Sequence, residues 1–163
     1  MSLVLYRIDD RLIHGQVVVG WGQPLDIGFI VLVDDEVAKS DWEQELYRMG
    51  TPPEMDVFFH SVIDAESALE RYNSEERSGI LLTGDIASML RLVKEAGIRT
   101  VNIGGIHHRP GRRQRLRYVF LFPEEEQLLR EMASLGAAVT AQDVPSSRAV
   151  ELTELLDSEA SVQ

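Results

Sequence analysis

Short apolar runs alternate along the chain with segments in which apolar residues recur at the three- and four-residue spacing of a helix. The runs predict strands at residues 3–8, 27–33, 55–59, 79–82, 100–103, 118–122 and 137–141. The segments between them predict helices at residues 14–21, 36–49, 62–72, 86–96, 123–135 and 146–156. Such alternation is typical of an α/β fold with an open, mainly parallel sheet and helices on both faces.

One passage, residues 103–118, interrupts the alternation because it has no helical pattern. It contains the run Gly-Ile-His-His-Arg-Pro-Gly, a composition typical of turns, so we expect a loop or a hairpin-like excursion there. One strand near the C-terminus is therefore expected to run antiparallel. We expect residues 1–156 to form a single domain and the small or polar residues 157–163 to be a frayed tail.

The composition excludes several classes of protein. The chain has 163 residues, of which 44% are hydrophobic, enough for one domain with a sizeable core. It has no cysteine, which rules out disulfides, zinc–thiolate sites and cysteine nucleophiles. Its net charge of -11 opposes non-specific binding to nucleic acid. No apolar stretch approaches the roughly 20 residues that span a bilayer, so a cytoplasmic protein is expected.

The passage from the first apolar run into the next helical segment, residues 7–17 (RIDDRLIHGQV), carries a distinctive set of polar side chains. Neutral imidazole is a nucleophile that takes up a phosphoryl group reversibly near neutral pH, so His14 is a candidate phosphoryl acceptor. A helix N-terminus attracts anions and disfavours imidazolium, so the predicted helix should keep His14 uncharged. Arg11 and the backbone N–H groups near Gly15 would then bind the phosphoryl oxygens.

Asp9 and Asp10 lie in the same passage and allow more than one interpretation. Either carboxylate can accept a hydrogen from one ring nitrogen of His14, which fixes the tautomer and leaves the other nitrogen free to attack. Alternatively, Asp10 caps the helix and Asp9 forms an ion pair with Arg11. The candidate site depends on the whole set of residues and not on a single histidine.

The passage 7–17 resembles the active-site motif of the IIB subunits of the mannose/fructose/sorbose family of phosphoenolpyruvate-dependent sugar phosphotransferase systems. In that motif, D-x-R-L-I-H-G-Q, the histidine carries the phosphoryl group. Residues 33–38 (VDDEVA) and 101–105 (VNIGG) resemble the ends of the family's second and fifth strands, so the resemblance covers most of the chain. It implies that His14 is the phosphoryl acceptor and Arg11 its electrostatic partner, with the two aspartates in the same loop.

The resemblance also implies a function and its partners. The chain would accept a phosphoryl group from the phosphohistidine of a IIA-type donor and pass it to a sugar held by a membrane IIC/IID permease. This protein-histidine to sugar phosphotransfer needs no metal, nucleotide or other cofactor. The phosphocarrier would be cytoplasmic, with membrane contact made through the permease. A homo-oligomer is also compatible with this interpretation.

Two departures from the family pattern motivate a rival interpretation. Asn or Ser followed by Pro is usual after the fourth strand, where this chain reads Thr83-Gly84-Asp85-Ile86. A glycine–lysine pair is usual where this chain reads Gly111-Arg112-Arg113. The alternative is a regulatory or binding module of the same fold whose phosphorylation signals metabolic state without driving transport. A nucleotide site is disfavoured because the chain has neither G-x-G-x-x-G after the first run nor a Walker-type G-K-[ST].

Basic residues concentrate in the predicted hairpin passage, where Arg109, Arg112 and Arg113 have two interpretations. They steer a phosphorylated partner toward the site, or they belong to a solvated turn that offsets the acidic remainder of the chain. His107 and His108 lack the spacing of zinc ligands, so no metal site is expected. Active residues of parallel sheets gather at the carboxyl ends of the strands. The loops expected to meet at that edge are 9–14, 34–35, 83–85 and 104–113.

Overall fold

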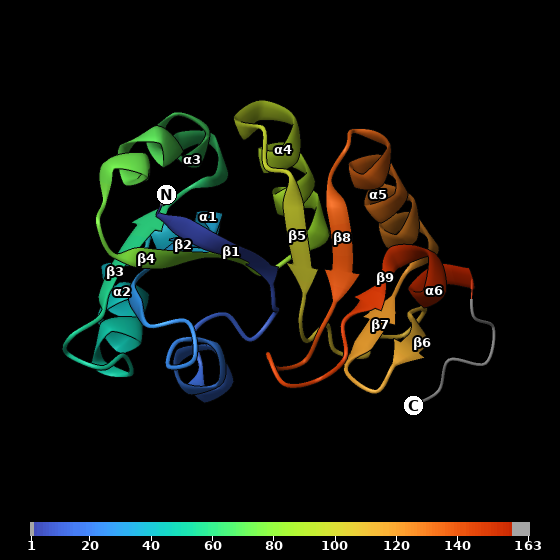
Figure 1. Ribbon diagram of the computed structural model, residues 1–163, viewed down its shortest axis with the longest axis horizontal. Coiled ribbons are helices and arrows are strands. Elements are labelled where there is room, and N and C mark those ends of the chain that lie inside the picture. Colours follow the sequence, from blue (N-terminus) through green and yellow to red (C-terminus); the bar gives the residue numbers. More distant parts are fainter. Residues whose placement is uncertain (1, 158–163) are drawn as a thin grey trace.

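Seven strands form one sheet, in the order β3-β2-β4-β1-β5-β8-β9, in the computed structural model, which describes residues 2–157 (Figure 1). The strands are β1 Leu3–Ile8, β2 Ile27–Val33, β3 Asp56–His60, β4 Ser78–Thr83, β5 Thr100–Ile103, β8 Ala138–Ala141 and β9 Val150–Glu151. Neighbouring strands are parallel except β8 and β9, which are antiparallel. The predicted α/β fold, with a mainly parallel sheet and one antiparallel strand near the C-terminus, is confirmed.

The expected hairpin is present in the passage that follows β5. Strands β6 Arg113–Leu116 and β7 Val119–Leu121 pair antiparallel in a separate two-stranded sheet. The apolar run 118–122 therefore corresponds to β7 and lies outside the main sheet. Its pattern resembles that of the other strands because Val119 and Leu121 are buried in a hydrophobic cluster that they share with strands of the main sheet.

The helices differ from the prediction in several segments. They are α1 Asp35–Ala38, α2 Asp41–Met49, α3 Val62–Ala68, α4 Ile86–Ala96, α5 Pro123–Ser134 and α6 Leu152–Asp157, with a π-helix η1 Gln16–Trp21 and a 3-10 helix η2 Leu69–Ser74. Residues 36–49 form two helices, because the Ser40 hydroxyl accepts the Glu43 N–H at 3.1 Å and caps a new helix.

The predicted helix 146–156 is also wrong over its first half. The Ser147 hydroxyl accepts the Val144 N–H at 3.1 Å and holds a turn there, and the short strand β9 follows before α6 begins. The frayed tail was expected over residues 157–163, but Asp157 is the last residue of α6, and residues 158–163 lie outside the described residues.

Helices cover both faces of the sheet, and each face has its own hydrophobic cluster (Figure 1). Helices α3, α4, α5 and α6 bury apolar side chains in one cluster, and η1 and α1 contribute to the other. Successive residues of β2 from Phe29 to Val33 alternate between the two clusters, as the two-residue period of a strand requires. No helix within residues 2–157 combines the length and the apolar character needed to cross a membrane.

Candidate functional site

The carboxyl ends of β1, β4 and β5 lie side by side, because β1 pairs in parallel with both of its neighbours. Asp9, directly after β1, donates its N–H to the carbonyl of Thr83 at the end of β4 at 2.9 Å. Asp10 donates its N–H to the carbonyl of Gly105, after β5, also at 2.9 Å. The predicted meeting of the loops 9–14, 83–85 and 104–113 is confirmed.

Leu12 shapes the loop after β1 and connects it to the end of β2. Its backbone is left-handed, with φ 58°, a conformation that costs a residue with a Cβ about 1 kcal/mol or more. Its N–H donates to the Asp9 carbonyl at 2.9 Å and closes a tight turn. A Cβ added at Gly84 would lie 2.9 Å from the Leu12 side chain and 3.8 Å from Asp34 Oδ2. The loop 34–35 therefore reaches the same edge of the sheet, as predicted.

Asp9 lies at the centre of the site and is fully buried. Its Oδ1 accepts the backbone N–H of Arg11 at 3.1 Å and the Nε–H of the same residue at 3.0 Å. Its Oδ2 accepts Arg11 Nη2 at 3.0 Å, the Gly105 N–H at 3.2 Å and Arg7 Nη2 at 3.4 Å. A buried carboxylate requires such donors, because burial of an unpaired charge is costly. The alternative in which Asp9 forms an ion pair with Arg11 is confirmed.

The surrounding guanidinium groups lower the pKa of Asp9. Burial raises the pKa of a carboxyl, but the hydrogen bonds and positive charges of Arg11 and Arg7 outweigh burial here, so the pKa of Asp9 lies below its ordinary value. Burial lowers the pKa of the Arg7 guanidinium, whereas the hydrogen bond to Asp9 raises the pKa of Arg11. The ionised form of Asp9 is therefore favoured in the folded chain.

This shift predicts a loss of stability in acid. A carboxyl whose pKa is lower in the folded chain binds fewer protons when the chain is folded. Its contribution to the free energy of unfolding is therefore complete above the unfolded pKa of about 3.9, and it is lost as the pH falls through the pKa of the folded chain. Urea unfolding of the wild type and of Asp9→Asn between about pH 5 and pH 2 measures this contribution. The free energy of unfolding should fall more for the wild type than for the variant as the pH is lowered. Equal losses would contradict the lowered pKa of Asp9 in the folded chain.

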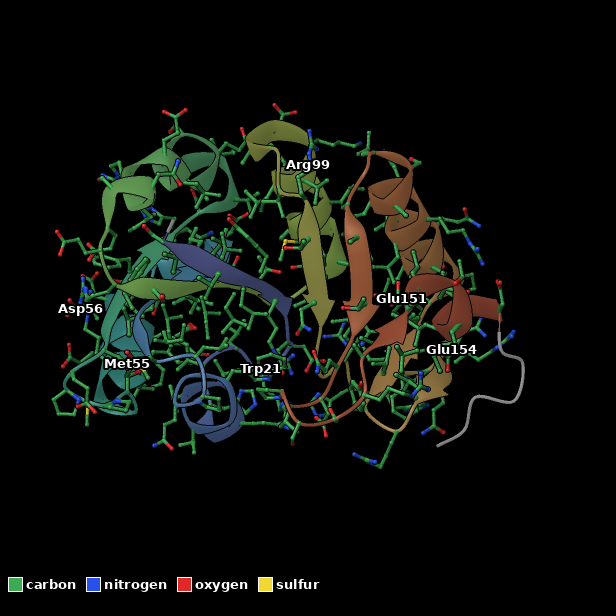
Figure 2. All side chains as sticks on the ribbon, in the orientation of Figure 1. Trp21, Met55, Asp56, Arg99, Glu151 and Glu154 are labelled. Atoms are coloured by element: carbon green, nitrogen blue, oxygen red, sulfur yellow. The ribbon has the colours of Figure 1, made fainter. Side chains whose placement is uncertain are left out.

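Arg7, on β1, is a fully buried guanidinium that the sequence analysis did not identify as part of the site. Its carbon Cζ lies 4.8 Å from the centroid of the Trp21 ring. Trp21, labelled in Figure 2, is the last residue of η1. Its other partners come from strands and loops far along the chain: Asn102 Oδ1, the Gln142 carbonyl at 2.9 Å and the Asp143 carbonyl at 3.1 Å. Arg7 thus holds the loop after β8 against the site.

Two glycines after β5 provide the space that these charged side chains occupy. A Cβ added at Gly104 would lie 2.7 Å from Asp9 Oδ2 and would clash with the Arg7 guanidinium. A Cβ added at Gly105 would lie 3.1 Å from Arg11 Nη2. The pair has little meaning as a sequence motif, but in the structure it allows the backbone to approach the charged cluster.

Arg11 is anchored on one side and open on the other. Its side chain is 35% exposed, and its Nη2 donates to Gln16 Oε1 at 2.8 Å as well as to Asp9. Gln16 Nε2 in turn donates to Asp143 Oδ1 at 2.8 Å. Arg11 Nη1 makes no hydrogen bond to any residue in the range 2–157, so it is available to an anion. Gln16 belongs to the active-site motif, but its bridging role was not predicted.

His14 lies beside this cluster with a side chain that is 20% exposed. Its Nδ1 is 2.8 Å from the Leu12 carbonyl, and because a carbonyl only accepts, Nδ1 carries the hydrogen. In the neutral ring, Nε2 therefore holds the lone pair, and it lies 4.0 Å from Asp9 Oδ2. The tautomer is set by the Leu12 carbonyl and not by a carboxylate, which corrects the sequence-based expectation.

The lone-pair nitrogen of His14 points inward in this conformation. Nε2 is shielded from solvent and has no hydrogen-bond partner among residues 2–157. The ring nitrogen that was expected to be free to attack is therefore closed off from solvent in the conformation observed. The exposed 20% of the side chain therefore belongs to other atoms of His14 and not to Nε2.

Asp10 does not cap the helix that follows. Its carboxylate accepts the His107 N–H at 2.8 Å and faces His107 Nδ1 at 2.6 Å, which fastens the loop after β5. The helix η1 is a π-helix of six residues that begins at Gln16, and the N–H groups of Val17 and Val18 donate to the His14 carbonyl. The helix expected over residues 14–21 is therefore present in shorter form, as a π-helix from Gln16, and its role as an anion-binding N-terminus stays a prediction.

The remaining candidates differ in exposure. Gly15 is exposed and a Cβ added there would meet nothing within 4 Å, so its proposed role in phosphoryl binding stays a prediction. Arg112 binds Glu125 through two hydrogen bonds at 3.1 and 2.7 Å, with 8% of its side chain exposed, which ties it to α5. Arg109 and Arg113 are exposed, and their side chains make no hydrogen bond to the described part of the chain.

Comparisons with known proteins identify the family of the chain. The family model described as PTS system sorbose subfamily IIB component matches residues 3–163. The sorbose-specific EIIB component of Klebsiella pneumoniae is 33% identical over 166 residues, which cover 98% of each chain. The mannose-specific EIIAB component of Escherichia coli strain K12 is 30% identical over 161 residues, which cover 96% of this chain and 49% of that protein. The crystal structure of the sorbose IIB domain from K. pneumoniae has a TM-score of 0.88 at 31% identity, over 98% of this chain and 99% of that one.

The fold and these comparisons place the chain among the phosphoryl carriers that are built on a mainly parallel sheet. The chain belongs to the sorbose subfamily of IIB components of the phosphotransferase system. Such components are phosphotransferases that take a phosphoryl group from IIA and transfer it to a sugar, so the predicted family and enzyme class are confirmed. The regulatory alternative gains no support from these relatives.

Proposed function

We propose that His14 is the phosphoryl acceptor, that a IIA-type phosphohistidine protein is its donor, and that a membrane IIC/IID permease presents the sugar that receives the group. The chain would associate with the membrane through that permease. The observation that carries the proposal is the position of His14, whose Nε2 lies 4.0 Å from the buried carboxylate that also anchors Arg11.

The transfer is an in-line displacement. The bond between phosphorus and the donor imidazole breaks as a bond forms between phosphorus and a ring nitrogen of His14, and the electron pair returns to the donor ring. For this reaction the His14 ring turns outward from its position beside Asp9. Arg11 stays tethered by Asp9, and its unpaired Nη1 is directed at a phosphoryl oxygen, where a charge-assisted hydrogen bond stabilises the transferred group.

The experiment follows the label through both steps. The chain is incubated with phosphoenolpyruvate carrying a radioactive phosphoryl group, the general phosphocarriers and a IIA-type donor, and the acid-labile label is mapped to a peptide. Membrane vesicles that contain the permease are then added with sorbose, mannose, fructose or N-acetylgalactosamine in turn. We expect label on the peptide that contains His14 and its loss to one of these sugars. Label on another peptide would contradict the acceptor assignment, and stable label with every sugar would contradict the transport role.

A further inference from the structure

Helix α2 exposes large apolar side chains close to the site. Trp42, Leu46 and Met49 are 71%, 48% and 73% exposed. They occupy positions i, i+4 and i+7, so they share one side of the helix, and we call this surface the α2 stripe. Trp, Leu and Met side chains exposed together at one place are typical of a protein-binding surface.

The helix is held firmly from its other side, so the exposure of the α2 stripe is not the result of a loosely attached helix. Gln44 Nε2 donates to the carbonyls of Val37 and Ala38 at 3.0 and 3.2 Å. Tyr47 is partly buried and packs against the hydrophobic cluster that contains η1 and α1. The fold thus fixes α2 through its polar side and Tyr47, and it leaves the apolar stripe without a partner within residues 2–157.

The α2 stripe is continuous with the site. Trp42 and Leu46 line a surface concavity of about 420 Å³ together with Ile13, the residue that precedes His14. A partner that brings a reacting group to His14 therefore covers this concavity as well. Such continuity makes a partner of the phosphotransfer reaction the natural occupant of the stripe.

The two sides of the site carry opposite charge, and this distinguishes the two partners. Helix α2 lies beside β3, and the loop after β1 lies between this helix and the passage after β5 (Figure 1). The α2 side has the acidic residues Asp41, Glu43 and Glu45, whereas the other side has the exposed Arg109 and Arg113. Cytoplasmic loops of membrane proteins are rich in Lys and Arg, which complement the acidic side, and a phosphorylated donor complements the basic side.

We propose that the α2 stripe, with its acidic border, is the surface on which the chain docks to the cytoplasmic loops of the sugar permease. This proposal rests on the proposed function, because it assigns a surface to one of the two transfer steps. The stripe would supply apolar contact, and Glu43 and Glu45 would pair with basic residues of the permease. The donor would approach from the side of Arg109 and Arg113.

The test separates the two steps in a variant that lacks the stripe. Trp42→Ala/Met49→Ala is labelled by the IIA-type donor, and discharge is then measured against vesicle concentration with the sugar that discharges the wild type. We expect the rate of labelling to stay within about twofold of the wild type, while the vesicle concentration for half-maximal discharge rises about tenfold or more. Leu135→Ala, which truncates an apolar side chain that is 43% exposed at the end of α5, is the matched control and should leave both steps unchanged.

A second variant tests the charge. Glu43→Lys/Glu45→Lys should weaken discharge and leave labelling intact, and the wild-type discharge should weaken as salt concentration rises. Circular dichroism and urea unfolding show whether each variant is folded. A folded stripe variant with normal discharge would overturn the proposal.

Other outcomes assign the stripe elsewhere and also overturn the proposal. Slower labelling with normal discharge would mean that the donor, and not the permease, binds the α2 stripe. The stripe would instead be a dimer interface if sedimentation experiments show a wild-type dimer that Trp42→Ala/Met49→Ala dissociates, with discharge unchanged. Failure of the proposed function is distinguishable, because the wild type would then carry no label on His14 or would not discharge to any sugar.

Discussion

Replacing His14 with alanine is expected to abolish phosphorylation while leaving the fold intact. The chain has four histidines, and the other three are His60, His107 and His108. Removal of the nucleophile should lower incorporation of acid-labile label by about 10³-fold or more, since Arg11 and Asp9 have no acceptor left to serve. The side chain is 20% exposed and makes one hydrogen bond, so the free energy of unfolding should fall by only about 1 kcal/mol.

The matched controls are His107→Ala and His108→Ala, because both of these histidines are exposed and lie in the loop after β5. They should retain labelling within about tenfold of the wild type, since neither replaces the nucleophile. Radioactive labelling from the donor mixture, followed by electrophoresis at alkaline pH, measures all three variants together. Label that persists in His14→Ala, or that disappears equally in His107→Ala, would show that the acceptor is another residue.

The period of the apolar residues was sufficient to predict the main sheet, because burial between two helical layers imposes continuous apolar runs on central strands. Strand β9 was not predictable in this way. It has only two residues, and its pairing with β8 depends on the turn that Ser147 holds before it. The division of residues 36–49 into two helices depends on one hydrogen bond that the Ser40 hydroxyl accepts from the Glu43 N–H, and an apolar pattern does not register such a polar residue.

The site was predictable where its members are close in sequence. Spacing alone placed Asp9, Arg11 and His14 in one loop, and the structure brings their side chains together around Asp9 Oδ2. Arg7 was missed because its position within an apolar strand hides a guanidinium whose hydrogen-bond partners, apart from Asp9, lie 95 or more residues further along the chain. The role of the Leu12 carbonyl was missed because it depends on a left-handed backbone, which leucine rarely adopts.

Replacing Asp9 with asparagine should produce the largest loss of stability of any isosteric change in the site. Both carboxylate oxygens of Asp9 accept hydrogen bonds, and every partner is an N–H group of Arg11, Gly105 or Arg7. An amide NH₂ in place of either oxygen would face those donors, and two guanidinium groups would lose their counter-charge. Breaking a buried pair in this way costs about 3–5 kcal/mol, a large part of the roughly 5–15 kcal/mol that stabilises a typical domain.

Asp10→Asn provides the matched comparison, because it makes the same change in the next residue of the same loop. The Asp10 side chain is 23% exposed and its partners are the N–H and the ring of His107, so the amide should cost only about 1 kcal/mol. Urea unfolding at neutral pH measures both variants, and slower labelling of His14 should accompany the Asp9 change because Arg11 loses its anchor. Equal stability of the two variants would mean that the Asp9 carboxylate is not the charge that holds Arg7 and Arg11, and the electrostatic basis of the site would then lie elsewhere.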